Sequence, residues 1–253
     1  MSWIHFFSAA LSGGFVVKIL DFVYSEFSRK REKTTSAKQV VAKHIDPILK
    51  SADQLLGQLI SLAKNDFRPL FSQSDTKQIE VEYTMYLIAN FWACLLVLEK
   101  DSIHVDLAER KEGRHLLRFI STLKAKKNRL LSRAEQQVIG ESIIEESHRG
   151  LKIKSFYHFL DTYKNPQTSF NLWFNPLRSL LEHSKSRAIR QHILLYGVIL
   201  HAMVDNLDAR HHYVRDRKSY PNKLTRRTRN DIENRIFGVY LTGIRDHAKY
   251  WKV

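Results

Sequence analysis

Apolar residues recur along most of the chain at spacings of three and four, which is the period of an α-helix that buries one face. Nine glycines and five prolines are few for 253 residues, and no succession of alternating strands is present. The pattern therefore predicts an all-α fold. Past residue 30 we expect helices over residues 36–44, 44–64, 75–101, 104–127, 132–147, 155–163, 172–183, 186–208 and 227–251.

Several of these helices begin with capping signals. Asp46 can cap a helix whose first position is Pro47, so we expect a new helix to start there. Asp75 can cap the next one. Ser132 and Glu135 have the spacing of a capping box, in which each side chain accepts a hydrogen bond from the backbone N–H of the other residue.

The start of the chain differs from the rest. Residues 2–17 carry no charge if His5 is neutral. Roughly 16 residues form about 24 Å of helix, slightly short of the roughly 20 residues that cross a bilayer. Lys18 can extend toward the lipid headgroups, and Trp3 favours the membrane interface at the other end. We expect a transmembrane helix over residues 1–27, with a buried or surface-lying amphipathic helix or a cleaved signal as alternatives.

Basic residues follow this apolar run directly. The segment SRKREK, residues 28–33, contains four basic side chains and one acidic side chain. Short flanks rich in Lys and Arg stay in the cytoplasm, so the N-terminus is expected outside. Residues 28–253 are then a basic cytoplasmic helical domain, held at the inner or plasma membrane by a single span.

Small residues repeat every four positions in the same apolar run. Ala9 precedes Gly13 at this spacing, and Ala10 precedes Gly14. Small side chains let helices approach closely in lipid, so these positions predict a homo-oligomer formed through the N-terminal helix. The alternative is that small residues are simply common in membrane spans.

Two later apolar runs are expected to be core helices. Residues 83–98 are uncharged, but a second span there would export a segment that begins with Arg110, Lys111 and Arg114. Residues 193–204 are expected to be core by default. Each run is apolar on all sides, as a buried helix is.

Cys94 lies within the first of these two runs and is the only cysteine of the chain. It can form no intramolecular disulfide, and its apolar neighbours indicate a small buried hydrophobic residue. A reducing compartment is the simplest interpretation.

Positive charge is the other global feature. The formal net charge is +15 and the isoelectric point is about 9.9. Residues 210–229 contain eight Arg or Lys and one acidic residue, with Tyr213 and Tyr220 between them. Such a segment can bind nucleic acid or nucleotides, lie on anionic lipid, or remain a solvated surface. The candidate polyanion-binding residues are Arg215, Arg217, Lys218, Lys223, Arg226, Arg227 and Arg229.

Common catalytic motifs are absent from the sequence, including the phosphate-binding glycine loop and the paired cysteines of a zinc site. Two Glu-x-x-His pairs, Glu112 with His115 and Glu145 with His148, have the spacing used in di-metal bundles, which also need two further inward Glu residues. No metal or cofactor is predicted. His201 lies one helical turn before Asp205, which favours a hydrogen-bonded pair at a helix end over a metal site.

A further pattern resembles the HEPN family, whose helical bundles are often RNases marked by an Arg and a His separated by four to six residues. The resemblance covers only three windows in this sequence, and it implies cleavage of RNA at the 2′-hydroxyl without a metal. The matching pairs are Arg110 with His115, Arg178 with His183, and Arg187 with His192.

Three functions are consistent with these patterns. The favoured one is a membrane-anchored, non-enzymatic helical protein that acts by oligomerisation or by binding an unidentified protein partner, in a membrane-linked stress or defence complex. The second is a membrane-tethered RNase of the HEPN type. The third is a peripheral module that binds anionic lipid and whose first helix only lies in the interface.

Overall fold

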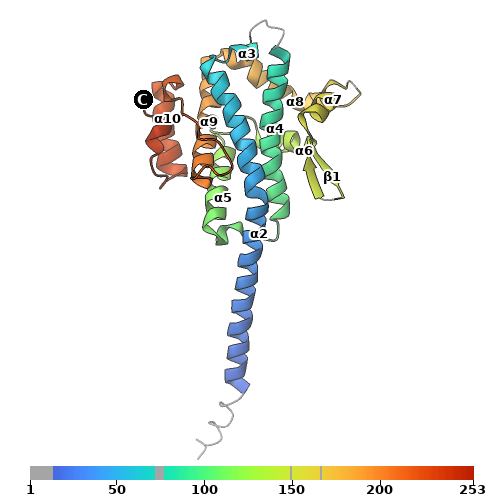
Figure 1. Cartoon of the computed structure of the whole chain (residues 1–253), viewed down its shortest axis with the longest axis vertical. Coiled ribbons are helices and arrows are strands. Elements are labelled where there is room, and N and C mark those ends of the chain that lie inside the picture. The colour runs from blue at the N-terminus through green and yellow to red at the C-terminus, as the bar shows by residue number, and fades with distance from the viewer. Residues whose placement is uncertain (1–13, 72–76, 149, 166) are drawn as a thin grey trace, which may run out of the picture.

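The computed structural model describes residues 14–71, 77–148, 150–165 and 167–253, and it describes side chains from residue 35 onward. The described chain is mostly helical, as predicted (Figure 1). Its α-helices are α2 Gly14–Lys64, α3 Arg68–Phe71, α4 Lys77–Asp101, α5 Lys111–Lys124, α6 Arg133–Ser142, α7 Phe156–Lys164, α8 Phe170–Glu182, α9 Arg187–Leu207 and α10 Arg226–Asp231. Shorter or wider turns form η1 Leu107–Glu109, η2 His183–Lys185, η3 Pro221–Lys223, the π-helical η4 Ile232–Tyr240 and η5 His247–Tyr250.

Helix α2 is both the longest element and the one that leaves the bundle. Figure 1 shows its first half extending alone, away from all other elements, before its second half joins the bundle. Ala37 is the first core residue on it. At 1.5 Å per residue, Gly14 lies about 35 Å from Ala37 along the helix axis. The first half of α2 is therefore a stalk.

The predicted helix start at Asp46 and Pro47 is wrong, because α2 continues through Pro47. Proline lacks a backbone N–H and costs about 3 kcal/mol or more inside a helix. Val41 before this point and Ile48 after it are both buried in the same core. Burial of one continuous face on both sides of the proline favours a single helix despite that cost. Asp75, the other predicted cap, lies outside the described residues.

Helix α4 lies at the centre of the bundle and packs against α2, α6, α7 and α8. Among the described residues it is the one helix long and apolar enough to cross a membrane, but 78% of its most apolar window is buried inside the protein. The Trp92 indole donates a hydrogen bond to the Tyr196 hydroxyl on α9 at 3.1 Å. Cys94 is buried, and burial raises the pKa of its thiol to about 11, which keeps it protonated and unreactive. The prediction of a core helix is confirmed.

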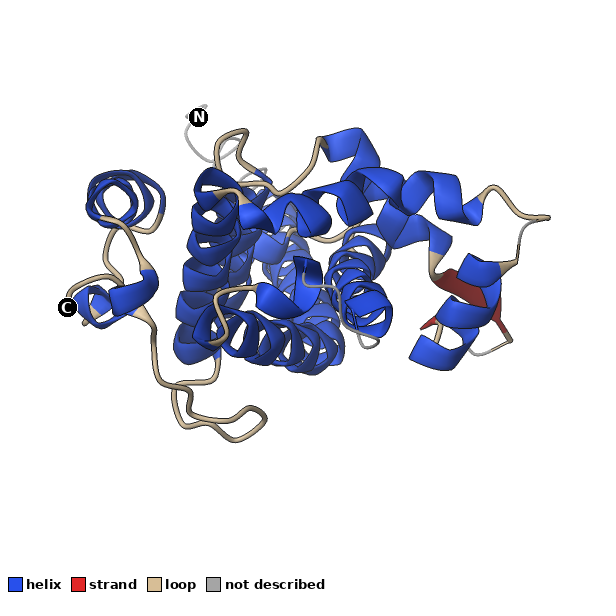
Figure 2. Cartoon of the chain, turned by 90° about the horizontal axis from the view of Figure 1, so that it is seen from above, coloured by secondary structure: helices blue, strands red, loops and turns tan. Residues whose placement is uncertain are grey.

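Helix α9 packs side by side with α2 and α5. Seen from above, the helical bundle lies between the strand pair at one edge of the molecule and the C-terminus at the other (Figure 2). Every residue of the predicted core run 193–204 is buried. Gly197 lies in this run because the Tyr220 hydroxyl occupies the space beside it: a Cβ atom there would be 2.2 Å from the Tyr220 oxygen.

Residues 132–147 form a helix only in part, so the predicted helix is too long. The capping box of Ser132 and Glu135 is present, but α6 ends at Ser142 and β1 Ile144–Ser147 follows. This strand pairs antiparallel with β2 Gly150–Ile153. Gly150 has a φ of 105°, a backbone conformation that residues with a side chain rarely adopt.

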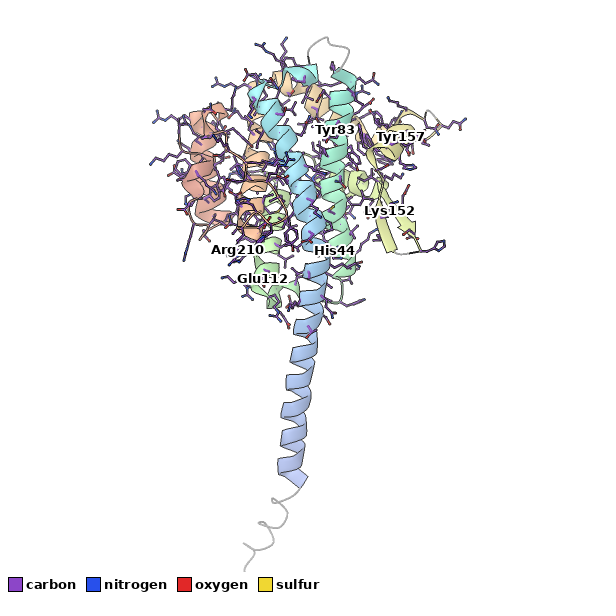
Figure 3. All side chains as sticks on the ribbon, in the orientation of Figure 1. His44, Tyr83, Glu112, Lys152, Tyr157 and Arg210 are labelled. Carbon is purple, nitrogen blue, oxygen red and sulfur yellow. The ribbon has the colours of Figure 1, made fainter. Side chains whose placement is uncertain are left out.

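Aromatic rings join α7 and α8 on the side of the bundle that carries this hairpin. The Phe159 ring lies 5.8 Å from the Phe170 ring and 5.1 Å from the Phe174 ring. Tyr157 and Lys152 point outward there, on the opposite side from Arg210 (Figure 3).

Candidate functional site

The basic segment between α9 and α10 is an ordered strap rather than a free loop. We call residues 208–225 the strap. The Asp208 carboxylate begins it by accepting hydrogen bonds from the backbone N–H groups of His212, Tyr213 and Val214 at 2.9, 2.8 and 3.1 Å. These bonds turn the chain back toward the bundle immediately after α9 ends.

The second half of the strap is fixed to α9. The buried Tyr220 hydroxyl donates to the Leu194 carbonyl at 3.0 Å. The Gln191 amide donates to the Lys223 carbonyl at 2.9 Å and accepts from the Thr225 N–H at 2.8 Å. The Gln191 side chain thus bonds two backbone groups of the strap, which holds this part of the strap against α9.

Two of the seven predicted polyanion-binding residues serve the fold. Arg217 forms a two-pronged ion pair with Asp53 on α2, with distances of 2.5 Å from Nε to Oδ1 and 2.8 Å from Nη2 to Oδ2. Lys223 donates to Asp66 Oδ1 at 2.9 Å. Arg217 links the strap to α2, and Lys223 links it to the turn that follows α2. Each cation is therefore already paired with a carboxylate.

The other predicted polyanion-binding residues are more available. Arg215, Lys218, Arg226 and Arg227 are exposed, and Arg229 is half-buried. Arg226 is the first residue of α10, after the Thr225 side chain caps that helix. Nearness in the sequence therefore does not show which cations of this segment are paired within the fold and which are exposed.

A cavity of about 600 Å³ lies between the strap, the end of α9 and the C-terminal residues. Its walls come from three parts of the chain, and both buried and exposed charged groups line it. The lining residues are His201, Asp205, Asp216, Arg217, Lys218, Ser219, Pro221, Lys249 and Lys252.

A buried polar cluster forms the inner wall of this cavity. The side chains of His201 and Asp205 are only 4% and 8% exposed, and His201 Nε2 lies 3.7 Å from Asp205 Oδ1. The second carboxylate oxygen, Oδ2, accepts from the Tyr250 hydroxyl at 2.8 Å and from Lys249 Nζ at 2.6 Å. Asp205 Oδ1 is buried and accepts no hydrogen bond from the described residues. The predicted hydrogen bond between His201 and Asp205 is therefore not formed, because 3.7 Å is too long for one.

Burial decides the protonation of this cluster. It lowers the pKa of His201 more than the nearby Asp205 carboxylate raises it, so the imidazole is neutral at pH 7. Burial and the Asp205 charge both raise the pKa of Tyr250, which keeps its hydroxyl protonated as a donor. The inner wall therefore presents one carboxylate, which is paired with the Lys249 ammonium and the Tyr250 hydroxyl, beside a neutral imidazole.

The three Arg and His pairs that match the HEPN spacing lie in three separate places. Arg178 donates to Glu182 and to Tyr163, whereas the His183 ring contacts the Ser179 carbonyl. His192 on α9 contacts the Arg129 carbonyl at 3.0 Å, and Arg187 is exposed at the start of the same helix.

The third pair, Arg110 and His115, lines a second cavity. This cavity has a volume of about 560 Å³ and lies where the stalk enters the bundle, between α2, α5 and α9. Glu112 also lines it and is exposed at this end of the molecule (Figure 3). The other Glu-x-x-His pair begins on strand β1, so the two pairs share no element. Among residues 14–71, 77–148, 150–165 and 167–253 no three His, Cys, Asp or Glu side chains converge as metal ligands would.

The residues proposed for the membrane contact fall mostly beyond what the structure describes. Trp3, Ala9 and Gly13 lie outside the described residues. Gly14 and Lys18 belong to the backbone of α2, in the part of the stalk furthest from the bundle. Both residues therefore belong to the same unbroken helix that enters the bundle.

Comparison with known proteins identifies no relative: no family model, no curated protein and no solved structure matches this chain.

Proposed function

We propose that this chain is a single-pass protein of the inner or plasma membrane, and that its cytoplasmic helical domain acts by self-association or by binding a protein partner. The continuity of α2 supports this proposal. The described part of this helix starts at Gly14, within the apolar run of residues 2–17, and continues into the bundle without a break. A rigid helix would hold the domain at a fixed distance from the bilayer.

Exposed aromatic side chains support the part of the proposal that concerns a protein partner. Tyr157 on α7 is 75% exposed, and Trp173 on the neighbouring helix α8 is 51% exposed, next to the exposed Leu172. Large exposed apolar side chains on adjacent elements are typical of interaction surfaces, and Trp and Tyr contribute most to binding there. Tyr157 lies on the hairpin side of the bundle, on the opposite side from Arg210 of the strap (Figure 3).

The membrane anchor has a direct test. We expect the full-length chain to sediment with membranes, to resist carbonate extraction and to need detergent, because residues 2–17 would lie in hydrocarbon. The chain beginning at Lys33 should be soluble, since it retains every core residue from Ala37 onward. Release of the full-length chain by carbonate would instead indicate a helix that lies in the membrane surface, and a soluble full-length monomer would refute the anchor.

The exposed arginines at the start of α10 support polyanion binding as a second activity. We expect the double substitution Arg226→Glu and Arg227→Glu to abolish binding of the soluble domain to polyanions, because it replaces two exposed cations with anions. The domain should stay folded, since neither side chain is tied into the fold as Arg217 is. Binding to single-stranded oligonucleotides should fall with salt at a slope of about 0.7 per phosphate contacted. Binding to anionic vesicles but not to neutral ones would identify lipid instead.

Lys152→Glu is the matched control for this pair, since Lys152 is exposed on the hairpin at the other side of the bundle. A folded wild-type domain that binds neither polyanion at low salt would leave this surface without that activity.

A further inference from the structure

We propose that the cavity where the stalk enters the bundle binds a single-chain anionic lipid, with the chemistry of a fatty acid. Its volume of about 560 Å³ lies within the range of small-molecule sites, which is about 300–1,000 Å³. Every residue that lines this cavity comes after Ala37, the first core residue of α2. The inference therefore does not depend on the membrane anchor.

One wall of the cavity is an apolar row on α2. The row consists of residues at helical spacing, namely Val41, Ala42, Ile45 and Leu49. Ala42 is exposed and Ile45 is half-buried, so the row offers apolar surface to a ligand. Leu207 at the end of α9 is also half-buried and adds to this lining. Most of the accessible surface of the cavity is apolar, and covering it with an alkyl chain is favourable in proportion to the area buried.

The stalk end of the cavity is positively charged. Lys38 on α2 lines it together with Arg110 and Lys111 at the start of α5. Among the described residues, none of these three side chains forms an ion pair or a hydrogen bond with another residue. Glu112 is the one acidic side chain of the lining, and it is exposed at the stalk end (Figure 3). Because the cations come from two elements, one carboxylate can accept hydrogen bonds from both sides of the cavity.

The order of these groups along α2 fits an elongated ligand. From Lys38 to Leu49 the helix rises about 16 Å, at about 1.5 Å per residue. The cation lies nearest the stalk, and the apolar row continues from it into the bundle. A carboxylate at Lys38 therefore places its alkyl chain along the row. Inorganic phosphate would leave the apolar row in water, and a neutral alkane would leave the cations without an anion.

Photocrosslinking of the full-length protein in nanodiscs of neutral phosphatidylcholine tests this proposal. The probe is dodecanoic acid with a diazirine on its chain, and mass spectrometry locates the crosslinked residues. Label should appear within residues 41–49 and 206–213, on both sides of the cavity. The methyl ester of the probe should label these positions at least tenfold less, because it lacks the anion.

Competition against the probe tests the apolar wall. Decanoate should compete at least tenfold more effectively than hexanoate, since each fully buried methylene adds about fourfold to the affinity. Acetate and inorganic phosphate should not compete. If the full-length chain is soluble without lipid, the same measurements apply in buffer.

Two variants separate the cations from the apolar row. The double substitution Lys38→Glu and Lys111→Glu should reduce crosslinking at the cavity at least tenfold. Ala42→Glu should do the same, because it places a carboxylate within the apolar row. All three positions are exposed, so the domain should stay folded. Lys50→Glu combined with Lys152→Glu is the matched control, since it makes the same change in net charge at exposed positions outside the cavity.

Three results would overturn the proposal. One is label confined to residues outside the cavity, such as the apolar run of residues 2–17. Another is equal labelling of the cavity by the acid and its methyl ester. The third is equal labelling of the wild type and the Lys38 and Lys111 double variant, which tests the proposal even if Ala42→Glu fails to fold.

Discussion

Gly197→Ala should destabilise the domain by a net amount of about 2 kcal/mol, although alanine is the better helix former. Alanine gains about 1 kcal/mol over glycine in a helix interior. Its Cβ, however, would lie 2.2 Å from the buried Tyr220 hydroxyl and 3.2 Å from a methyl group of Leu59. Overpacking of a close-packed core costs about 1–3 kcal/mol, and here it would also displace a hydroxyl from its hydrogen bond to the Leu194 carbonyl. Thermal unfolding of the chain that begins at Lys33 measures the effect.

Tyr220→Phe provides the control that assigns this cost to the hydroxyl. Alone it should cost about 1 kcal/mol for the lost hydrogen bond. In the double variant the nearest ring atom would lie 3.5 Å from the alanine Cβ, which is an ordinary contact. The combined loss should therefore be smaller than the sum of the single losses by about 1 kcal/mol. Additive losses would show that Gly197 is required for another reason.

Most of the fold could be predicted from hydrophobic periodicity, and the errors have local causes. The core runs 83–98 in α4 and 193–204 in α9 are apolar on all sides, which is typical of a buried helix. The helix break at Pro47 was wrong because a local capping signal competed with the burial of one long face on α2. The hairpin after α6 was missed because strands of four residues carry almost no periodic signal.

The site was predictable only where its residues are close in sequence. The spacing of His201 and Asp205 identified them as neighbours on one helix face. Tyr250 follows Asp205 by 45 residues, and no local pattern connects the two. Sequence spacing also grouped Arg217 with the exposed cations of its segment, because its partner Asp53 lies 164 residues earlier.

Arg217→Glu should therefore act on stability, whereas substitution of its exposed neighbour should not. The Arg217 guanidinium donates two hydrogen bonds to Asp53 and packs so closely over Gly57 that a Cβ there would lie 2.9 Å from it. Glutamate would remove both bonds and place a second carboxylate against Asp53 in a largely buried position. Breaking such a pair costs about 3–5 kcal/mol when the pair is buried, and we expect about 3 kcal/mol for this partly exposed one.

Two further variants make this expectation specific. Arg217→Lys keeps the charge but loses the two-pronged geometry, so it should cost about 1 kcal/mol. Arg215→Glu, at an exposed position two residues earlier, should change the unfolding free energy by no more than about 0.5 kcal/mol. Equal losses for Arg217→Glu and Arg215→Glu would contradict the structural role of the ion pair. If Arg217→Glu costs more stability than Arg215→Glu, polyanion binding is best tested at Arg226 and Arg227. Lost binding in an Arg217 variant could then result from a displaced strap rather than from a lost contact with the polyanion.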